Sequence, residues 1–153
     1  MKASILLLKI KDDMENQSSY RSLIKQKMSA DENSGTISSI MTRYNYDNFT
    51  EIMGRKGIDQ DFEIDDVKLN DFLRSIDYYL NTYAPEDADL KIYITGISTY
   101  LAFIARRPLH PPGIEFSNGA GVFEKDGFFY CSGKRTFLKE KLSLCKYCVC
   151  RPV

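Results

Sequence analysis

The 153-residue sequence contains no tryptophan and only one histidine, and its acidic and basic residues cancel at 21 each. One histidine cannot supply the His-Glu-x-x-His pair of a zinc protease. A formal charge of zero gives no overall attraction to nucleic acid or to a membrane surface. Walker A and dinucleotide-binding glycine patterns are also missing, so the sequence gives no sign of the common nucleotide-dependent enzymes.

Long apolar segments are absent as well. The longest, residues 92–104, has 13 residues interrupted by glycine, serine and threonine, whereas a membrane-spanning helix needs about 20. The short apolar segment 4–10 is followed by three charged residues instead of the small residues of a cleavage site. We therefore expect no membrane association and a cytoplasmic location. In that reducing compartment, clustered cysteines favour metal or redox chemistry over structural disulfides.

The length most economically fits a single domain, residues 1–153. Apolar residues at helical spacing predict a mainly α fold, a bundle of about five helices with a C-terminal β-hairpin and a metal-binding knuckle. The body would be residues 1–107, and residues 108–153 would form a metal-binding tail packed on it. The expected helices cover approximately residues 3–14, 18–31, 36–53, 65–83 and 85–107.

Two of these helices have clear boundary signals. Asp65 and Asp66 place negative charge at the start of the fourth helix, where the helix dipole favours it. Pro85 suits the first position of the fifth helix, and Pro108 would stop it. The broad apolar surface of the fifth helix predicts that it is the central, most buried one. In the third helix, residues 44–48 are poor helix formers, so we expect a break or kink there.

The composition changes after Pro108, where prolines and glycines become frequent. Asp126-Gly127 is a strong signal for a two-residue hairpin turn. Closing the turn there pairs Phe123 with Tyr130 and Val122 with Cys131. A single hairpin is marginally stable in water, so this one needs support from outside.

The tail also holds the only histidine and all four cysteines. Cys145 and Cys148 form a Cys-x-x-Cys pair, whose two-residue gap lets both thiolates reach one ion from a tight turn. Cys131 lies at the mouth of the hairpin, and His110 follows the end of the fifth helix. The sequence therefore predicts a closed tetrahedral site made of His110, Cys131, Cys145 and Cys148, with zinc as the default ion and an iron–sulfur cluster as the competitor.

Cys150 is a fifth candidate ligand that could replace His110. We prefer His110 because neighbouring prolines hold it rigidly, whereas Cys150 is three residues from the end of the sequence. A redox dithiol would require a βαβ context, and disulfides or space-filling cysteines remain open. A zinc deaminase needs a glutamate two positions after the histidine, where Pro112 stands. A site closed by four protein ligands favours a structural role, so the sequence favours a non-enzymatic protein.

The tail motifs resemble those of uncharacterised protein family 0305, also called domain of unknown function 2115, from methanogenic archaea. The similarity rests on the motifs 110–113, 129–131 and 145–149, on Phe116 and Gly119, and on the end of the fifth helix at 100–105. The family pattern has Pro-Gly where this chain has Ser117-Asn118, proline where it has Ser132, and phenylalanine where it has Tyr147. None of these differences removes a proposed ligand. The resemblance implies the same site and no particular reaction.

The expected function is that of a small archaeal protein with a structural metal site, acting as a binding or interaction module for a protein or nucleic-acid partner. The alternatives are an iron–sulfur electron-transfer protein and a nucleic-acid-binding protein. The second alternative is suggested by an uneven charge, because residues 1–105 carry a net of −5 (12 basic, 17 acidic) and residues 106–153 a net of +5 (9 basic, 4 acidic). The basic side chains concerned are Lys134, Arg135, Lys139, Lys141, Lys146 and Arg151. Aromatic residues are not interleaved with them, which favours a simple solvated surface over a nucleic-acid site.

Overall fold

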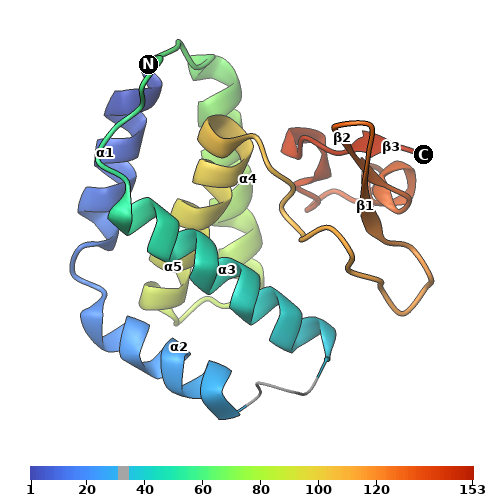
Figure 1. Ribbon diagram of the computed structural model, residues 1–153, viewed down its shortest axis with the longest axis horizontal. Coiled ribbons are helices and arrows are strands. Elements are labelled where there is room, and N and C mark those ends of the chain that lie inside the picture. The colour runs from blue at the N-terminus through green and yellow to red at the C-terminus, as the bar shows by residue number, and fades with distance from the viewer. Residues whose placement is uncertain (31–34) are drawn as a thin grey trace.

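A computed structural model describes residues 1–30 and 35–153, and within them the chain is mainly helical, as predicted (Figure 1). Five longer helices form a body, and a short helix and three strands follow in a tail that lies beside it. The predicted loop at the end of the second helix falls mainly on residues 31–34, outside the described part. The helices of the body are α1 (Ala3–Met14), α2 (Ser18–Ala30), α3 (Ile37–Gly54), α4 (Asp66–Tyr83) and α5 (Ala88–Thr99).

Side-chain caps explain where α4 and α5 begin. The Asp65 carboxylate accepts hydrogen bonds from the backbone N–H groups of Val67 (3.0 Å) and Lys68 (3.2 Å), which have no partner within the helix. Asp87 caps α5 in the same way through Leu90 (2.9 Å). The prediction that Pro85 is the first helical residue was therefore wrong by one turn. Asp87 offers the capping oxygen, and Pro85 lies in the turn before it.

Helix α3 is continuous from residue 37 to residue 54, so the predicted break at 44–48 was also wrong. Intrinsic preference is a weak influence when a helix packs on others, and Phe49 and Ile52 are buried in the body. The Asn48 side chain donates to the Tyr44 carbonyl (2.8 Å) within the helix, so its polar group is satisfied there. The Asn48 side-chain oxygen also accepts a hydrogen bond from the Arg107 guanidinium (2.9 Å), which ties α3 to the chain just after the last turns of the central helix.

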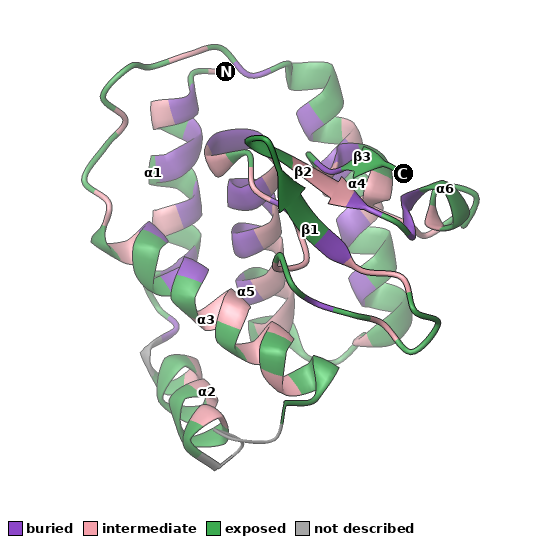
Figure 2. Ribbon diagram, turned by 45° about the vertical axis from the view of Figure 1, so that its right-hand side comes forward, coloured by how far each residue is buried: buried purple, intermediate pink, exposed green. Residues whose placement is uncertain are grey.

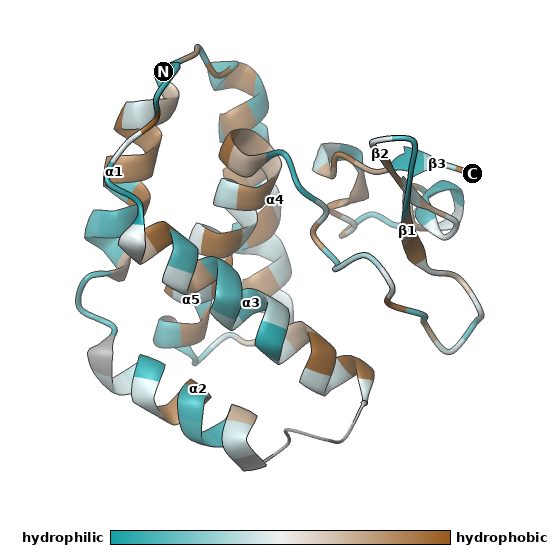
Figure 3. Ribbon diagram, in the orientation of Figure 1, coloured by the Kyte–Doolittle hydropathy of each residue, from teal (hydrophilic) through white to brown (hydrophobic). Residues whose placement is uncertain are grey.

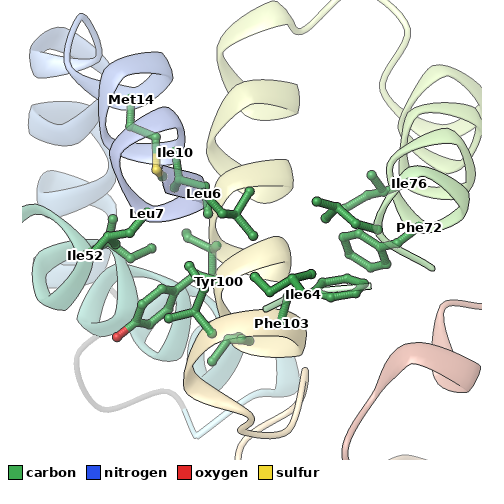
Figure 4. Packing of buried hydrophobic residues seen from close by; sticks show 14 of the residues in the cluster. Leu6, Leu7, Ile10, Met14, Ile52, Ile64, Phe72, Ile76, Tyr100 and Phe103 are labelled. Carbon is green, nitrogen blue, oxygen red and sulfur yellow. The ribbon is translucent and has the colours of Figure 1, made fainter. Parts of the chain in front are cut away.

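Helix α5 is central, as its broad apolar surface predicted, because it contacts α1, α3 and α4 (Figure 1). The buried residues of these helices face one another in a single apolar core (Figures 2 and 4). Gly96 allows α1 and α5 to approach closely, since a Cβ atom there would lie 2.6 Å from the sulfur of Met14. By contrast α2 is largely hydrophilic (Figure 3) and lies at the periphery of the body.

The last turns of the central helical run differ from the α-helix that the sequence predicted. Residues Tyr100–Ala105 form a π-helix, whose backbone hydrogen bonds span five residues instead of the four of an α-helix. Arg106 then adopts a left-handed conformation (φ 52°), and the N–H of Arg107 bonds back to the Leu101 carbonyl (3.0 Å). This closes the helix in the manner of a C-terminal cap and directs the chain away from the body towards Pro108.

The tail contains the predicted hairpin, and its predicted register is confirmed. Strands β1 (Val122–Lys125) and β2 (Phe128–Cys131) are antiparallel, with Phe123 opposite Tyr130 and Val122 opposite Cys131. The sequence did not predict the further elements: α6 (Lys134–Phe137), a 3₁₀ turn at Cys145–Tyr147, and β3 (Arg151–Pro152). Strand β3 pairs with β2 in parallel, so the support that the hairpin needs comes partly from the chain's own last residues.

Among the described helices, none combines the length and the apolar character that crossing a membrane would require.

Candidate metal centre

Two strands bring Cys131 and Cys150 into one small apolar cluster. Cys131 ends β2, and Cys150 immediately precedes β3, which pairs with β2 through Tyr130–Arg151 and Cys131–Pro152. Side chains alternate between the two faces of a strand, so Cys150, two residues before Pro152, lies on the same face as Cys131. Both thiols are almost fully buried, at 2% and 8% exposure for Cys150 and Cys131. The four buried members of this cluster are Ile114, Val122, Cys131 and Cys150.

The Cys145–Cys148 pair lies on the tight turn that the two-residue spacing predicted. The Cys148 N–H donates to the Cys145 carbonyl (3.1 Å) across the 3₁₀ turn. Tyr147, between them, points instead into the helical body, and its ring lies edge-on to Phe72 of α4 at 5.1 Å. Tyr147 therefore fixes the turn to the body, whereas Cys148 packs against the buried cluster of the tail.

The Cys148 and Cys150 thiols influence each other's protonation. Hydrogen bonding with Cys150 lowers the pKa of Cys148, and the same interaction raises the pKa of Cys150, so the pair favours one thiolate at Cys148. The backbone N–H of Leu109 supports this thiolate by donating to its sulfur (N to Sγ 3.5 Å), while burial opposes it.

Cys145 and Cys131 lie within electrostatic reach of that pair. Burial raises the pKa of the half-buried Cys145, a hydrogen bond with Ser143 opposes the shift, and the Cys148 and Cys131 thiols raise it further. All four cysteines are free thiols. Four residues spread over positions 131–150 are thus gathered in one region of the tail.

A buried lysine lies among these cysteines. Lys134 is 8% exposed, and its ammonium group donates to the backbone carbonyls of Cys148 (2.8 Å) and Cys150 (2.6 Å). No ion pair joins it to a carboxylate in the described part of the chain. A buried ammonium without a carboxylate partner is costly, and neighbouring thiolates would offset its charge. The sequence assigned Lys134 to the basic surface, and this was wrong, because the side chain points inward.

His110 has different surroundings. Its ring lies edge-on to Phe116 at 5.1 Å, and burial lowers its pKa, which favours the neutral imidazole that a metal would require. The loop is tied to α3, because the Tyr44 hydroxyl donates to the Pro108 carbonyl (2.6 Å). Among the described residues, no hydrogen bond connects His110 with a cysteine.

The described residues contain no group of three or more His, Cys, Asp or Glu side chains placed as a ready set of metal ligands. The structure gathers the cysteines without showing a formed site. The sequence reasoning set Cys150 aside because of its position near the end of the chain. Its one available signal was the Cys148-Val149-Cys150 spacing, which puts two thiols on the same side of an extended segment.

The remaining basic side chains of the tail are more exposed, but several have local partners. The Arg151 guanidinium lies over the Phe128 ring at 3.7 Å, and the Lys146 ammonium over the Tyr147 ring at 4.9 Å. Lys146 also lines a shallow groove of about 360 Å³ between α4 and the tail. The other residues lining the groove are Asp71, Arg74, Ser75, Tyr78, Lys141, Leu142 and Tyr147.

The chain is similar to several proteins of methanogenic archaea. A UPF0305 protein of Methanocaldococcus jannaschii is 34% identical over 162 residues, covering all of this chain and 98% of that protein. A UPF0305 protein of Methanococcus maripaludis strain C7 is 32% identical over 95 residues, covering 60% of this chain and 56% of its own length. A UPF0305 protein of Methanothermobacter thermautotrophicus is 29% identical over 109 residues, 71% of this chain and 66% of that protein.

No solved structure matches the chain. The sequence pattern of DUF2115, described as an uncharacterized protein conserved in archaea, matches residues 1–152. The resemblance seen in the tail motifs is therefore confirmed over almost the whole length, and the chain belongs to the DUF2115 family of archaeal proteins.

Proposed function

We propose that this protein is a small cytoplasmic binding or interaction module whose tail is ordered by one structural metal ion held by cysteine thiolates. One observation supports the proposal above all: the buried Lys134 ammonium, which no ion pair joins to a carboxylate in the described part of the chain, donates to the carbonyls of Cys148 and Cys150, and Cys150 is buried in one cluster with Cys131. Thiolates are soft ligands, and zinc is the ion that such sets most often hold.

The chemistry of these residues fits a metal better than it fits a purely apolar core. The buried cluster of the tail has four members, and two of them are cysteines. A cluster of this size contributes little burial, whereas a structural zinc ion supplies about 10–16 kcal/mol of apparent binding energy to folding in small domains. As placed, the side chains form no ready ligand set, so binding would require the thiols to rotate towards a common point.

The proposal assigns no catalytic residue. A metal closed by four protein ligands has no open position for substrate or water, which is the arrangement of structural sites. An iron–sulfur cluster with an electron-transfer role is the alternative, since the same thiolates would hold it. Anaerobic purification followed by elemental analysis separates zinc, iron and no metal.

The direct test is thermal melting of the metal-loaded protein with and without a chelator. We expect one equivalent of zinc per chain and a lower melting temperature after its removal, and the same loss in Cys148→Ser without chelator. A protein that purifies anaerobically without metal, and whose melting curve is unchanged by zinc or chelator, would overturn the proposal.

A nucleic-acid partner is the second candidate, and the groove beside α4 is the observation that favours it. Arg74, Lys141 and Lys146 line this groove together with Tyr78 and Tyr147, so cations and aromatic rings do meet there. The burial of Lys134 and the ion pair of Arg74 with Asp71 reduce the available charge. Binding of a labelled oligonucleotide that weakens steeply with salt would support this function, and no binding at low salt would exclude it.

A further inference from the structure

We propose that Cys150 takes the fourth ligand position in place of His110, giving a metal site of four thiolates: Cys131, Cys145, Cys148 and Cys150. This inference rests on the proposed metal site and decides its composition. It reverses the preference drawn from the sequence, in which rigidity favoured His110 and nearness to the chain end counted against Cys150.

The first support is the position of Cys148 beside Cys150 in the tail cluster. Cys150 is buried in this cluster, Cys148 packs against it, and a single residue separates the two. Two thiolates on one tetrahedral zinc ion, each about 2.3 Å from the metal, are about 3.8 Å apart. Because both side chains belong to one small cluster, rotation of the thiols would bring them to that separation.

The second support is the strand pairing, which is independent of any sulfur contact. The β2–β3 register holds Cys131 beside Pro152, and the alternation of side chains puts Cys150 on the same face. Both cysteines are buried in the same cluster, and Cys148 packs against it. The backbone thus places Cys131 and Cys150 in one cluster with Cys148 beside it, and their thiols would still have to turn towards a common point to bind an ion.

The third support is Lys134. Its ammonium group donates to the carbonyls of both Cys148 and Cys150, so it bridges the two residues that would flank the ion. These two bonds tie the backbone of Cys148 and Cys150 to the start of α6. Its positive charge would also offset part of the negative charge that four thiolates bring.

His110, in contrast, has a sufficient structural explanation. Its ring packs edge-on to Phe116, and its loop is held by the bond from Tyr44 to Pro108. A lone histidine in such a place supports the loop between body and tail without binding a metal. We therefore assign it a packing role.

The test uses the full chain loaded with zinc and, separately, with cobalt(II). X-ray absorption of the zinc protein reports the ligand atoms directly, and we expect four sulfurs at about 2.3 Å and no nitrogen. With cobalt, His110→Ala should keep the wild-type thiolate-to-metal absorption and affinity. Cys150→Ser should lose about a quarter of that absorption. Its affinity should fall by more than the roughly 10- to 100-fold that is typical of losing an outer-shell partner.

Two further variants separate a ligand role from a folding role. Cys150→His should keep one bound metal with a spectrum typical of three sulfurs and one nitrogen, because imidazole can occupy the vacated position. Val149→Ala changes the same segment without removing a ligand and should leave the spectrum unchanged. Three sulfurs and one nitrogen in the wild type, or loss of metal in His110→Ala with retention in Cys150→Ser, would overturn this inference while leaving the metal site intact. Failure of the wild type to bind zinc or cobalt would instead overturn the proposed function itself.

Discussion

The helical body and the tail are held together by different means. Among the described residues, the body buries 18 apolar residues in one cluster, which Tyr147 of the tail also joins. The buried cluster of the tail has four members, its strands are two to four residues long, and a buried lysine lies among its cysteines. A body of this kind is stable through burial of apolar surface, whereas the tail buries little apolar surface of its own. The contrast locates the candidate site in the part of the chain that apolar packing alone supports least.

The largest effect is expected from a cavity in the body. Leu7 of α1 is 1% exposed, and Leu7→Ala should lower the free energy of unfolding by about 2–5 kcal/mol through lost burial and an unfilled space. Leu8, its neighbour on the same helix, is 64% exposed and provides the matched control. Leu8→Ala should change stability by less than about 0.5 kcal/mol. Denaturant unfolding of both variants checks the difference, and equal effects would contradict the packing described for α1.

A smaller effect is expected where the tail is attached to the body. Tyr147→Ala removes the ring that packs on Phe72, and we expect a loss of about 1.5–3 kcal/mol and faster hydrogen exchange in the tail than in the body. Tyr147→Phe is the control. It keeps the ring and removes only the hydroxyl, which lies 3.3 Å from the Ser75 hydroxyl, so its cost should be about 1 kcal/mol or less. Exchange that rises equally in body and tail would mean that the two parts unfold as one unit.

The smallest effect, with the opposite sign, is expected at Tyr93 of α5. Its buried hydroxyl has no hydrogen-bond partner among the described residues, so Tyr93→Phe should leave stability unchanged or raise it by up to about 1 kcal/mol. Burial raises the pKa of Tyr93 above its ordinary value near 10. The unfolded chain therefore loses this proton first, and the stability of the wild type should fall as pH rises above about 10.

Tyr93→Phe should make that alkaline fall shallower. The remainder would come from the other buried tyrosines, among them Tyr20 and Tyr44, whose pKa values burial raises to about 12. Denaturant unfolding between pH 8 and about 11 measures the slope. A slope identical to that of the wild type would show that the Tyr93 hydroxyl reaches water in the folded protein.

The sequence predicted the elements whose signals are local. Helical spacing located the five helices, and Asp126-Gly127 fixed the hairpin and its register, because a two-residue turn leaves one pairing. The wrong predictions for helix boundaries and breaks have two causes: a stronger capping residue nearby and tertiary packing. Asp87 outweighed Pro85 as a helix start, and tertiary packing kept α3 continuous through residues 44–48.

The tail was predicted less well because its organisation depends on contacts between distant residues. Nothing in the local sequence of Lys134 distinguishes it from the exposed lysines that follow, and its burial results from the return of the chain at residues 148–150. The two-residue strand β3 is too short to show alternation, so neither its pairing with β2 nor the burial of Cys150 beside Cys131 was predicted.

The parallel pairing of β2 and β3 makes residues 132–150 a loop whose two ends are fixed together. Such a loop should tolerate changes in length unevenly. Extra residues near the exposed Glu140 would cost little, because loop-closure free energy rises by only about 0.6 kcal/mol for each doubling of length. One residue inserted between Cys148 and Arg151 would instead reverse which side chains face the cluster. The fold therefore leaves the length of this loop free to vary near Glu140, whereas it constrains the spacing from Cys148 to Arg151.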